Sequence, residues 1–206
     1  IIEYVDATFD GPKLYPTDPD EQAFMQASMK REDDLHLCVR ALTFRYFLPV
    51  EMMRKDDAAV DVYEAEGAET VGGEVDGRKA IEVDFWRKMN ANGGITDAQI
   101  VDAAGEFLKA FAELEERLDG QEWLLASGFS ALDIAWWITV FRITSMGFPT
   151  DRFPRLLAWY ERIAAREDFK REVANPPEID EISKAHQAAC ADAGKSMQDV
   201  IAAAGL

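Results

Sequence analysis

The sequence is poor in the residues that build metal sites, disulfide frameworks and catalytic triads. It has two cysteines and two histidines among 206 residues. Cys38 and Cys190 lie far apart, and the absence of any CxxC pair or Cys/His cluster argues against a zinc site or a disulfide framework. His36 and His186 offer little to a metal site or a triad. Two free thiols fit a reducing compartment, so we expect a cytoplasmic protein.

Basic residues and long apolar runs are also scarce. Lys and Arg number 22 against 39 Asp and Glu, which gives a net charge of −17. Such a surface repels the phosphates of nucleic acids and of anionic membranes, so neither is expected as a partner. The most apolar stretch, residues 131–146, is interrupted by Asp133 and Arg142. No run reaches the roughly 18 apolar residues of a transmembrane helix, so none is expected.

Helical periodicity covers most of the chain. The proline-rich segment DGPKLYPTDP predicts a linker, and Asp18 can cap the helix that follows, with Pro19 in its first turn. Glu21 stands three residues after Asp18, as in a capping box. Apolar residues at three- and four-residue spacing then predict one long helix from Asp20 to about Leu48.

A change of composition follows this helix. Residues 56–76 hold eight acidic residues and no basic one. This predicts a solvated, mobile insertion rather than a binding tail, in which only ETVGGEV has the character of a strand. A short helix closed by the NGG segment at 92–94 comes next. A strong helix then begins with a predicted capping box of Thr96 and Gln99.

A charged residue stands in the most apolar part of the chain, GFSALDIAWW at 128–137. Ser130 and Asp133 are three residues apart and directly precede an apolar helix, so each can accept a hydrogen bond from the backbone N–H of the other. Asp133 then faces the positive end of the helix dipole. We interpret Ser130 and Asp133 as a structural capping box and not as catalytic residues. Another helix over FPRLLAWYERIAAREDF, a Pro-Pro break and two tail helices complete an all-α fold.

Three of these segments resemble the helical C-terminal domain of the cytosolic glutathione transferases. The first is IIEYVDATFDGPKLYPTDPDEQA, which resembles the last helix of the family's thioredoxin-like N-terminal domain and its linker. The second is LDGQEWLLASGFSALDIAWW, which resembles the yLaG…SlADi signature, with Ser130 and Asp133 at its capping positions. The third is FPRLLAWYERIAAREDF, which resembles yPnLxaWyxRixxRPaf, although Glu167 stands where the family often has proline. The long linker and tail resemble bacterial members such as the lignin β-etherases.

The resemblance implies a fold and a domain organisation. We expect the glutathione-transferase C-terminal bundle, with long antiparallel helices, a buried capped helix over 130–146 and C-terminal tail helices. Residues 1–17 would be the end of an N-terminal-domain helix and the interdomain linker. Residues 18–175 would be the helical domain, with its acidic insertion at about 54–77, and residues 176–206 the tail.

The resemblance also implies where the chemistry lies. In this family glutathione binds the thioredoxin-like domain, and the residues that hold its thiolate would precede Ile1. Because the first residue is not methionine, we expect that the N-terminal domain is missing from this chain. We therefore expect glutathione as the co-substrate of the full-length protein, and no catalytic residue here.

Four residues of the predicted long helix are candidates for the substrate site. Met29, Asp33, Leu37 and Arg40 lie on roughly one helical face, and helices in this position line the cleft between the two domains in the family. Met29 and Leu37 would then contact an apolar electrophile, while Arg40 or Asp33 would touch glutathione or a partner subunit. An ordinary mixed or dimer-facing surface is the alternative interpretation of the same face.

Three interpretations of the whole chain stay open. In the first, it forms the electrophile-pocket wall and the dimer interface of a glutathione transferase that acts on a small electrophilic substrate. In the second, it is a stand-alone, non-catalytic module for protein interaction. In the third, it is an unrelated helical bundle that shares only capping and periodicity with the family. The first two predict a homodimer with the long helix at its interface.

Overall fold

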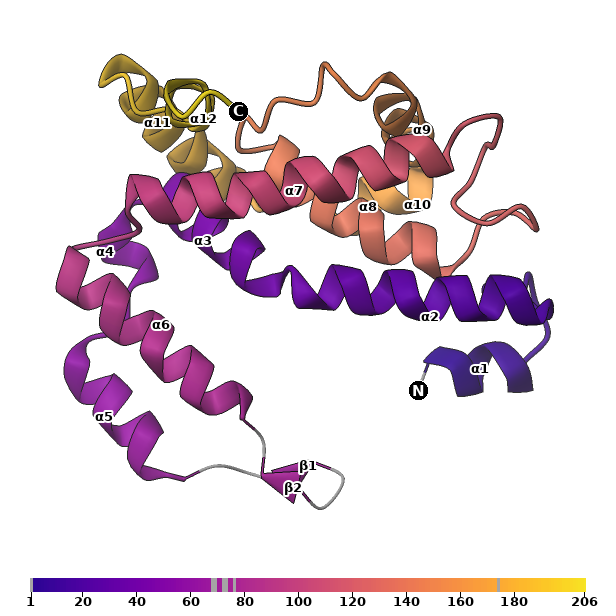
Figure 1. Ribbon diagram of the computed structural model, residues 1–206, viewed down its shortest axis with the longest axis horizontal. Helices are drawn as coiled ribbons and strands as arrows, with labels where there is room; N and C mark the ends of the chain where they lie inside the picture. Colours follow the sequence, from indigo (N-terminus) through magenta and orange to yellow (C-terminus); the bar gives the residue numbers. More distant parts are fainter. Residues whose placement is uncertain (1, 68–69, 72–73, 76, 174) are drawn as a thin grey trace.

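The computed structural model describes residues 2–67, 70–71, 74–75, 77–173 and 175–206, and in these residues the fold is helical apart from one two-stranded hairpin (Figure 1). The predicted all-α class is confirmed. The helices and strands in chain order are α1 (Ile2–Thr8), α2 (Pro19–Asp34), α3 (His36–Tyr46), α4 (Val50–Met53), α5 (Asp57–Ala65), β1 (Thr70–Val71), β2 (Glu74–Val75), α6 (Arg78–Asn92), α7 (Asp97–Arg117), α8 (Ala131–Thr144), α9 (Pro154–Ala164), α10 (Glu167–Glu172), α11 (Pro177–Asp192) and α12 (Met197–Ala203).

The helix predicted over residues 20–48 is in fact two helices, α2 and α3, which meet at Leu35. The Leu35 N–H donates to the carbonyl of Glu32 at 3.0 Å, a tighter turn than an α-helix makes, and the Leu35 side chain turns into the core with 1% exposed. Residues 32–34 are all acidic and lie at the negative end of the α2 dipole, which disfavours a further turn. Nδ1 of His36 lies 3.0 Å from the Asp33 carbonyl that the break leaves free.

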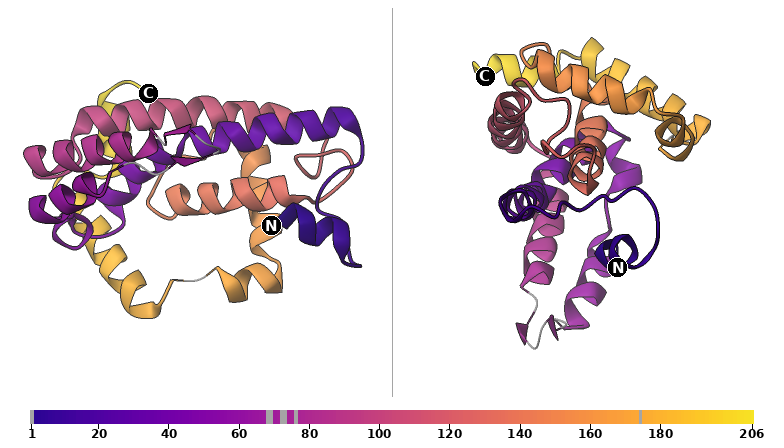
Figure 2. Two further views of the ribbon diagram at one scale, coloured as in Figure 1. Left: turned by 90° about the horizontal axis from the view of Figure 1, so that it is seen from below. Right: turned by 90° about the vertical axis from the view of Figure 1, so that its right-hand side faces the viewer.

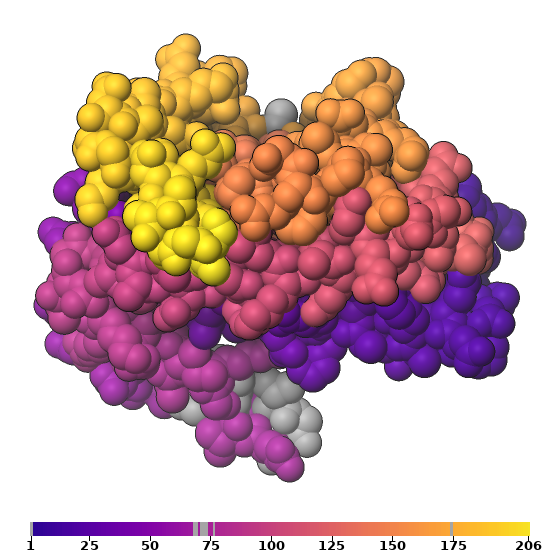
Figure 3. Space-filling view, turned by 45° about the horizontal axis from the view of Figure 1, so that its top comes forward, coloured from indigo at the N-terminus to yellow at the C-terminus, as the bar shows by residue number. Residues whose placement is uncertain are grey.

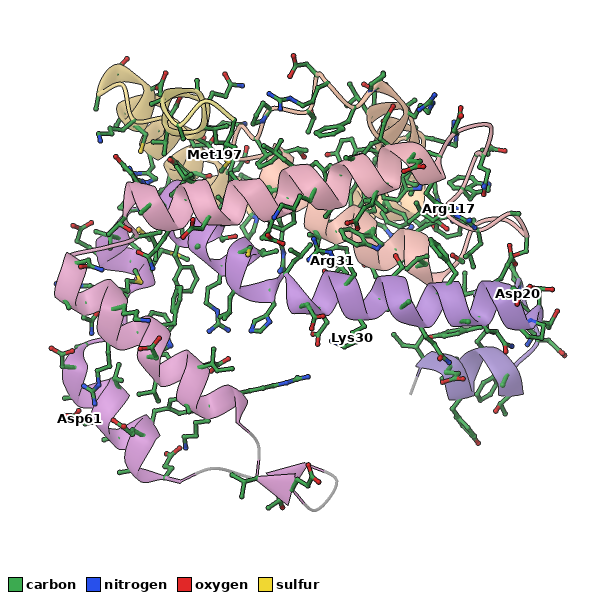
Figure 4. All side chains as sticks on the ribbon, viewed as in Figure 1. Asp20, Lys30, Arg31, Asp61, Arg117 and Met197 are labelled. Atoms are coloured by element: carbon green, nitrogen blue, oxygen red, sulfur yellow. The ribbon has the colours of Figure 1, made fainter. Side chains whose placement is uncertain are left out.

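The acidic segment forms a helix where its composition predicted a mobile insertion. Asp56 caps α5 by accepting the Ala59 N–H at 2.7 Å, and the Val60 side chain is fully buried where α5 packs on α6. Because apolar burial and capping act together, α5 and α6 form a helical hairpin, the arm, which projects from the body (Figure 1). Asp61, on α5, also ties it to α6 because Arg87 donates to its carboxylate at 2.5 Å (Figure 4).

The tip of the arm contains the segment ETVGGEV that had the character of a strand. Strands β1 and β2 pair antiparallel there, with Thr70 opposite Val75. Glu69, Gly72 and Gly73 of this segment lie outside the described residues, as does Ile1. At the other end of α6, Gly93 adopts φ +67° as the C-cap, which confirms the predicted stop.

Helix α7 runs along the body and carries the largest share of the core. The predicted capping box of Thr96 and Gln99 is present, and the apolar face of the helix is buried against α3, α9 and α12. Two arginines connect α7 with α2 (Figure 4). Arg31 of α2 donates to Glu106 at 3.3 Å, and the guanidinium of Arg117 lies 4.1 Å from the ring centroid of Phe24.

Helix α8 is the buried central helix, and the N-terminal linker and α2 are fastened near its start. Asp18 and Pro19 start α2 as predicted. Glu21, instead of completing a capping box, accepts the N–H of Ser127 at 3.0 Å in the loop before α8, and the Ala131 N–H at the start of α8 donates to the Leu14 carbonyl at 3.0 Å.

The C-terminal part of the chain wraps around one side of this bundle. The helix predicted over residues 153–169 divides into α9 and α10, and the Pro-Pro break leads into α11 as predicted. Figure 2 shows the chain passing from α10 to α11 on the side of the bundle away from α7. Helix α11 contacts α3, and α12 lies across one end of α7, where Met197 is buried (Figures 3 and 4).

Candidate functional site

The carboxylate of Asp133 is a structural centre and has no capacity left for chemistry. It is fully buried at the start of α8, where it forms a capping box with Ser130. Oδ2 accepts the N–H and the hydroxyl of Ser130, each at 2.9 Å. Oδ1 accepts the Leu124 N–H at 3.0 Å and the indole N–H of Trp159 at 2.8 Å. Four protein donors therefore occupy the lone pairs of this carboxylate.

The four residues proposed for a substrate face are divided between two helices, because the break at Leu35 places two of them on α2 and two on α3. Met29 is half-buried on α2 and packs against the core. Asp33 is exposed, with Oδ2 3.5 Å from Nη2 of Arg78 at the start of α6. Leu37, on α3, lines a shallow groove of about 280 Å³ between α3, α6 and α7.

The fourth residue, Arg40, connects α3 with the arm. It donates to Oε1 of Glu82 at 3.0 Å, and the hydroxyl of Tyr63 donates to the other carboxylate oxygen at 3.1 Å. Burial on its own would raise the pKa of Glu82, but the hydrogen bonds from Arg40 and Tyr63 outweigh it and hold that pKa below its ordinary value. The Arg40 guanidinium is thereby engaged within the chain.

A more enclosed site lies elsewhere, between α3, α4, α8 and the segment that follows α10. It is a cavity of about 520 Å³, within the range of small-molecule sites. Its apolar lining consists of Phe47, Met53, Ile138, Phe141, Met146 and Val173. Its polar lining consists of Thr43, Arg142, Ser145, Glu172 and Asn175. We call this space the α8 cavity.

Stacked aromatic rings fix the α8 wall of the cavity. Phe141 stacks on Trp137 with centroids 5.3 Å apart and an interplanar angle of 9°, and Trp137 stacks on Tyr160 at 5.5 Å and 12°. Phe169 meets Trp137 edge-on at 4.8 Å, and the Trp137 indole donates to the Tyr160 carbonyl at 3.0 Å. Rings held from several sides keep one arrangement, so the wall is preformed.

Neither thiol is an activated nucleophile. Burial raises the pKa of Cys38 and of Cys190. Nε2 of His186 lies 2.8 Å from the Arg45 carbonyl, and because a carbonyl only accepts, Nε2 must carry the proton. It therefore cannot take the proton of the Cys190 thiol, whose sulfur lies 3.8 Å away. Within the described part of the chain, no three His, Cys, Asp or Glu residues gather as a metal site would require.

Comparison with known proteins gives the family. Residues 58–162 match the model of the glutathione S-transferase C-terminal domain. The chain belongs to this family. A solved structure, the β-etherase LigF from Sphingobium sp. strain SYK-6, shares the fold of this chain, with a TM-score of 0.60 and 22% sequence identity over 82% of this chain and 69% of that one. The curated proteins contain no significant match.

The structure shows which site residues the sequence pattern located and which it missed. The SALD segment at 130–133, which carried the resemblance, is the cap of α8. Ile138, Phe141 and Arg142 of the same helix line the cavity at helical spacing, together with Ser145 at its C-cap. Because α8 is apolar on several faces, periodicity does not distinguish its cavity face from its core face. Among the described residues, no helix combines the length and apolar character needed to cross a bilayer.

Proposed function

We propose that this chain is the helical domain of a glutathione transferase. The residues that line the α8 cavity would form one wall of its site for a small electrophilic substrate. The observation that carries the proposal is the preformed aromatic wall in a chain of this family. Among the described lining residues there is no cysteine, histidine or paired carboxylate that would do chemistry itself. The reactive group would be the thiolate of glutathione, held by a thioredoxin-like domain. Its sulfur would bond to the electrophilic carbon while the leaving group departs with the electron pair of the broken bond.

The first helix supports this arrangement. Ile2, Val5 and Phe9 recur at helical spacing and are 63%, 46% and 62% exposed, so α1 and the residue after it present an apolar face to solvent. We assign residues 1–17 to the end of a thioredoxin-like domain and the linker, residues 18–175 to the helical domain and residues 176–206 to its tail. The contact between Leu14 and Ala131 would then hold that domain at a fixed place beside α8.

The residues of α2 and α3 fit a second role in the same protein. We propose a cytoplasmic homodimer with α2 and α3 at its interface, as the resemblance implies. Asp33 is exposed and retains the proposed contact with glutathione or the partner subunit. Met29 and Leu37 are partly exposed and stay candidates for the substrate side, whereas Arg40 acts mainly through Glu82.

The test uses the protein purified from its native source, with glutathione and 1-chloro-2,4-dinitrobenzene as substrates. We expect retention on immobilised glutathione and formation of the thioether. Ile138→Trp, which fills the cavity, should raise the KM for the electrophile at least tenfold and leave the KM for glutathione unchanged. Val62→Trp is the matched control, since Val62 is 62% exposed on the arm. An intact mass near 23.1 kDa together with no glutathione retention would contradict the proposal and favour the interaction module.

A further inference from the structure

We infer that the α8 cavity selects aromatic substrates that carry an anionic group, and that Arg142 is the residue that recognises this group. The inference rests on the proposed function and adds a substrate class to it. It follows from three features of the cavity lining: an arginine without an ion-pair partner, a carboxylate already neutralised, and a buried hydroxyl without a partner.

Arg142 stands at the mouth of the cavity and is not used inside the chain. It follows Phe141 on α8, and its side chain is exposed. Throughout the described ranges, no carboxylate lies within ion-pair distance of its guanidinium, although other arginines such as Arg40, Arg87 and Arg155 are paired. In a chain of net charge −17, a guanidinium left without a carboxylate is available to an anion from outside.

The acidic residue of the lining does not cancel this charge. Glu172 is the only carboxylate among the cavity-lining residues that are described. Its Oε1 accepts the Nε–H of Arg171 at 2.6 Å, so these two side chains form a neutral pair. The mouth of the cavity therefore carries the net positive charge of Arg142, which favours a carboxylate, a phenolate or a similar anion.

The interior of the cavity favours an aromatic ring as the other part of the ligand. Phe47 and Phe141 offer aromatic surface, and Met53 and Met146 offer thioethers that adapt to a ring. Oγ1 of Thr43 is buried and has no hydrogen-bond partner among the described residues. Such a hydroxyl is expected to find a partner, and a ring oxygen substituent of a bound ligand would supply one. A volume of about 520 Å³ accommodates a ring and its side chain.

The experiment compares two probes that differ in one charge. Binding of trans-cinnamate and of methyl cinnamate to the intact protein is measured by calorimetry at low salt. Because Arg142 is exposed, we expect cinnamate to bind only about threefold to fivefold more tightly than the ester. Arg142→Gln should remove this preference by weakening cinnamate and leaving the ester unchanged. Arg152→Gln removes the same charge from an exposed arginine outside the cavity lining and should keep the preference.

The outcomes separate this inference from the proposed function. Equal affinities of the wild type for acid and ester, or equal effects of Arg142→Gln and Arg152→Gln, would overturn the inference. If Ile138→Trp impairs conjugation of a neutral electrophile and no anion preference exists, the proposed function stands and the inference fails. An anion preference that depends on Arg142, in a protein that forms no thioether, would support the binding site and remove the transferase proposal on which it was built.

Discussion

The indole N–H of Trp159 donates to Oδ1 of Asp133 at 2.8 Å, and both side chains are fully buried. Asp133 begins α8 and Trp159 lies in α9, so one carboxylate caps a helix and fastens a second one. The same oxygen accepts the N–H of Leu124 from the loop between α7 and α8. A buried charge is costly when it is unpaired, and here charge-assisted hydrogen bonds from three segments offset that cost.

Asp133→Ala should therefore be far more destabilising than removal of an ordinary cap. We expect a loss of about 3–5 kcal/mol in the free energy of unfolding, because the substitution leaves buried donors without a partner. The chain contains a matched control, the capping box of Ser196 and Asp199 at the start of α12, where Asp199 is exposed. Asp199→Ala should cost about 1 kcal/mol. Urea unfolding followed by circular dichroism measures both, and equal losses would disprove the role assigned to Asp133.

The pair of Arg40 and Glu82 should make the attachment of the arm depend on pH. The pKa of Glu82 lies below its ordinary value of 4.5 in the folded chain. A carboxylate whose pKa is lowered by folding stabilises the fold at pH values above its ordinary pKa. That contribution is lost as the pH falls from about 4.5 through the pKa of the folded state.

Arg40→Met tests this directly. We expect it to lower the free energy of unfolding at pH 7 by up to about 1 kcal/mol, and the difference from wild type to shrink in acid. Lys88→Met is the control on the same arm, because the Lys88–Asp84 pair is 63% and 59% exposed. Lys88→Met should have no measurable effect at either pH. A difference between Arg40→Met and wild type that does not change with pH would contradict the prediction.

The hydroxyl of Tyr46 should contribute nothing to stability at neutral pH. It is buried and has no hydrogen-bond partner in the described residues, and burial raises the pKa of Tyr46 to about 12. Tyr46→Phe should leave the free energy of unfolding at pH 7 unchanged or raise it by up to about 1 kcal/mol.

The alkaline range separates Tyr46 from other tyrosines. Since the folded pKa is raised, the wild type should be unaffected below pH 10 and lose stability as the pH rises from 10 to 12, where the unfolded chain ionises first. Tyr46→Phe should lose less over this range. Tyr4→Phe, which changes a tyrosine that is 68% exposed, should follow the wild type. An alkaline loss of the same size in Tyr46→Phe would show that another group is responsible.

Val60 is the fully buried side chain in the contact of α5 with α6. Amide hydrogen exchange should show protection over α5 in the wild type, although the segment is acidic. Val60→Asp places a charge at a fully buried position and should abolish this protection while α7 and α8 keep theirs. Val62→Asp, two residues further along and 62% exposed, should leave it intact. Rapid exchange over α5 in the wild type would support the mobile insertion that composition predicted.

Helix boundaries were predictable where a local signal sets them. Asp18 with Pro19, Thr96 with Gln99, and the glycine at 93 act through neighbouring backbone, and each holds in the structure. The break at Leu35 was not predictable from apolar spacing, because the spacing continues through it while the acidic residues and the burial of Leu35 end the helix. In α5, one buried side chain outweighs a run of exposed carboxylates.

The candidate site was predictable only in part. The spacing of Met29, Asp33, Leu37 and Arg40 was interpreted on one continuous helix, and the break divides these residues between α2 and α3. The α8 cavity draws on four segments that are remote in sequence, so no spacing along one helix could reveal it. Arg142 differs from other surface arginines because it lines the cavity and has no ion-pair partner among the described residues, and both are properties of the folded chain.

The contact between Leu14 and Ala131 has a consequence for the order of folding. Leu14 precedes α2 and Ala131 follows α7 in the sequence. The whole chain segment between them must therefore close into a loop before this hydrogen bond can form. The arm connects α5 with α6 through a short segment and requires little closure entropy, so it can form early and unaided. Helix α8, whose neighbours α2, α3 and α9 come from both halves of the chain, would acquire its environment last. The slowest step in refolding should therefore be the burial of the central helix and not the formation of the projecting hairpin.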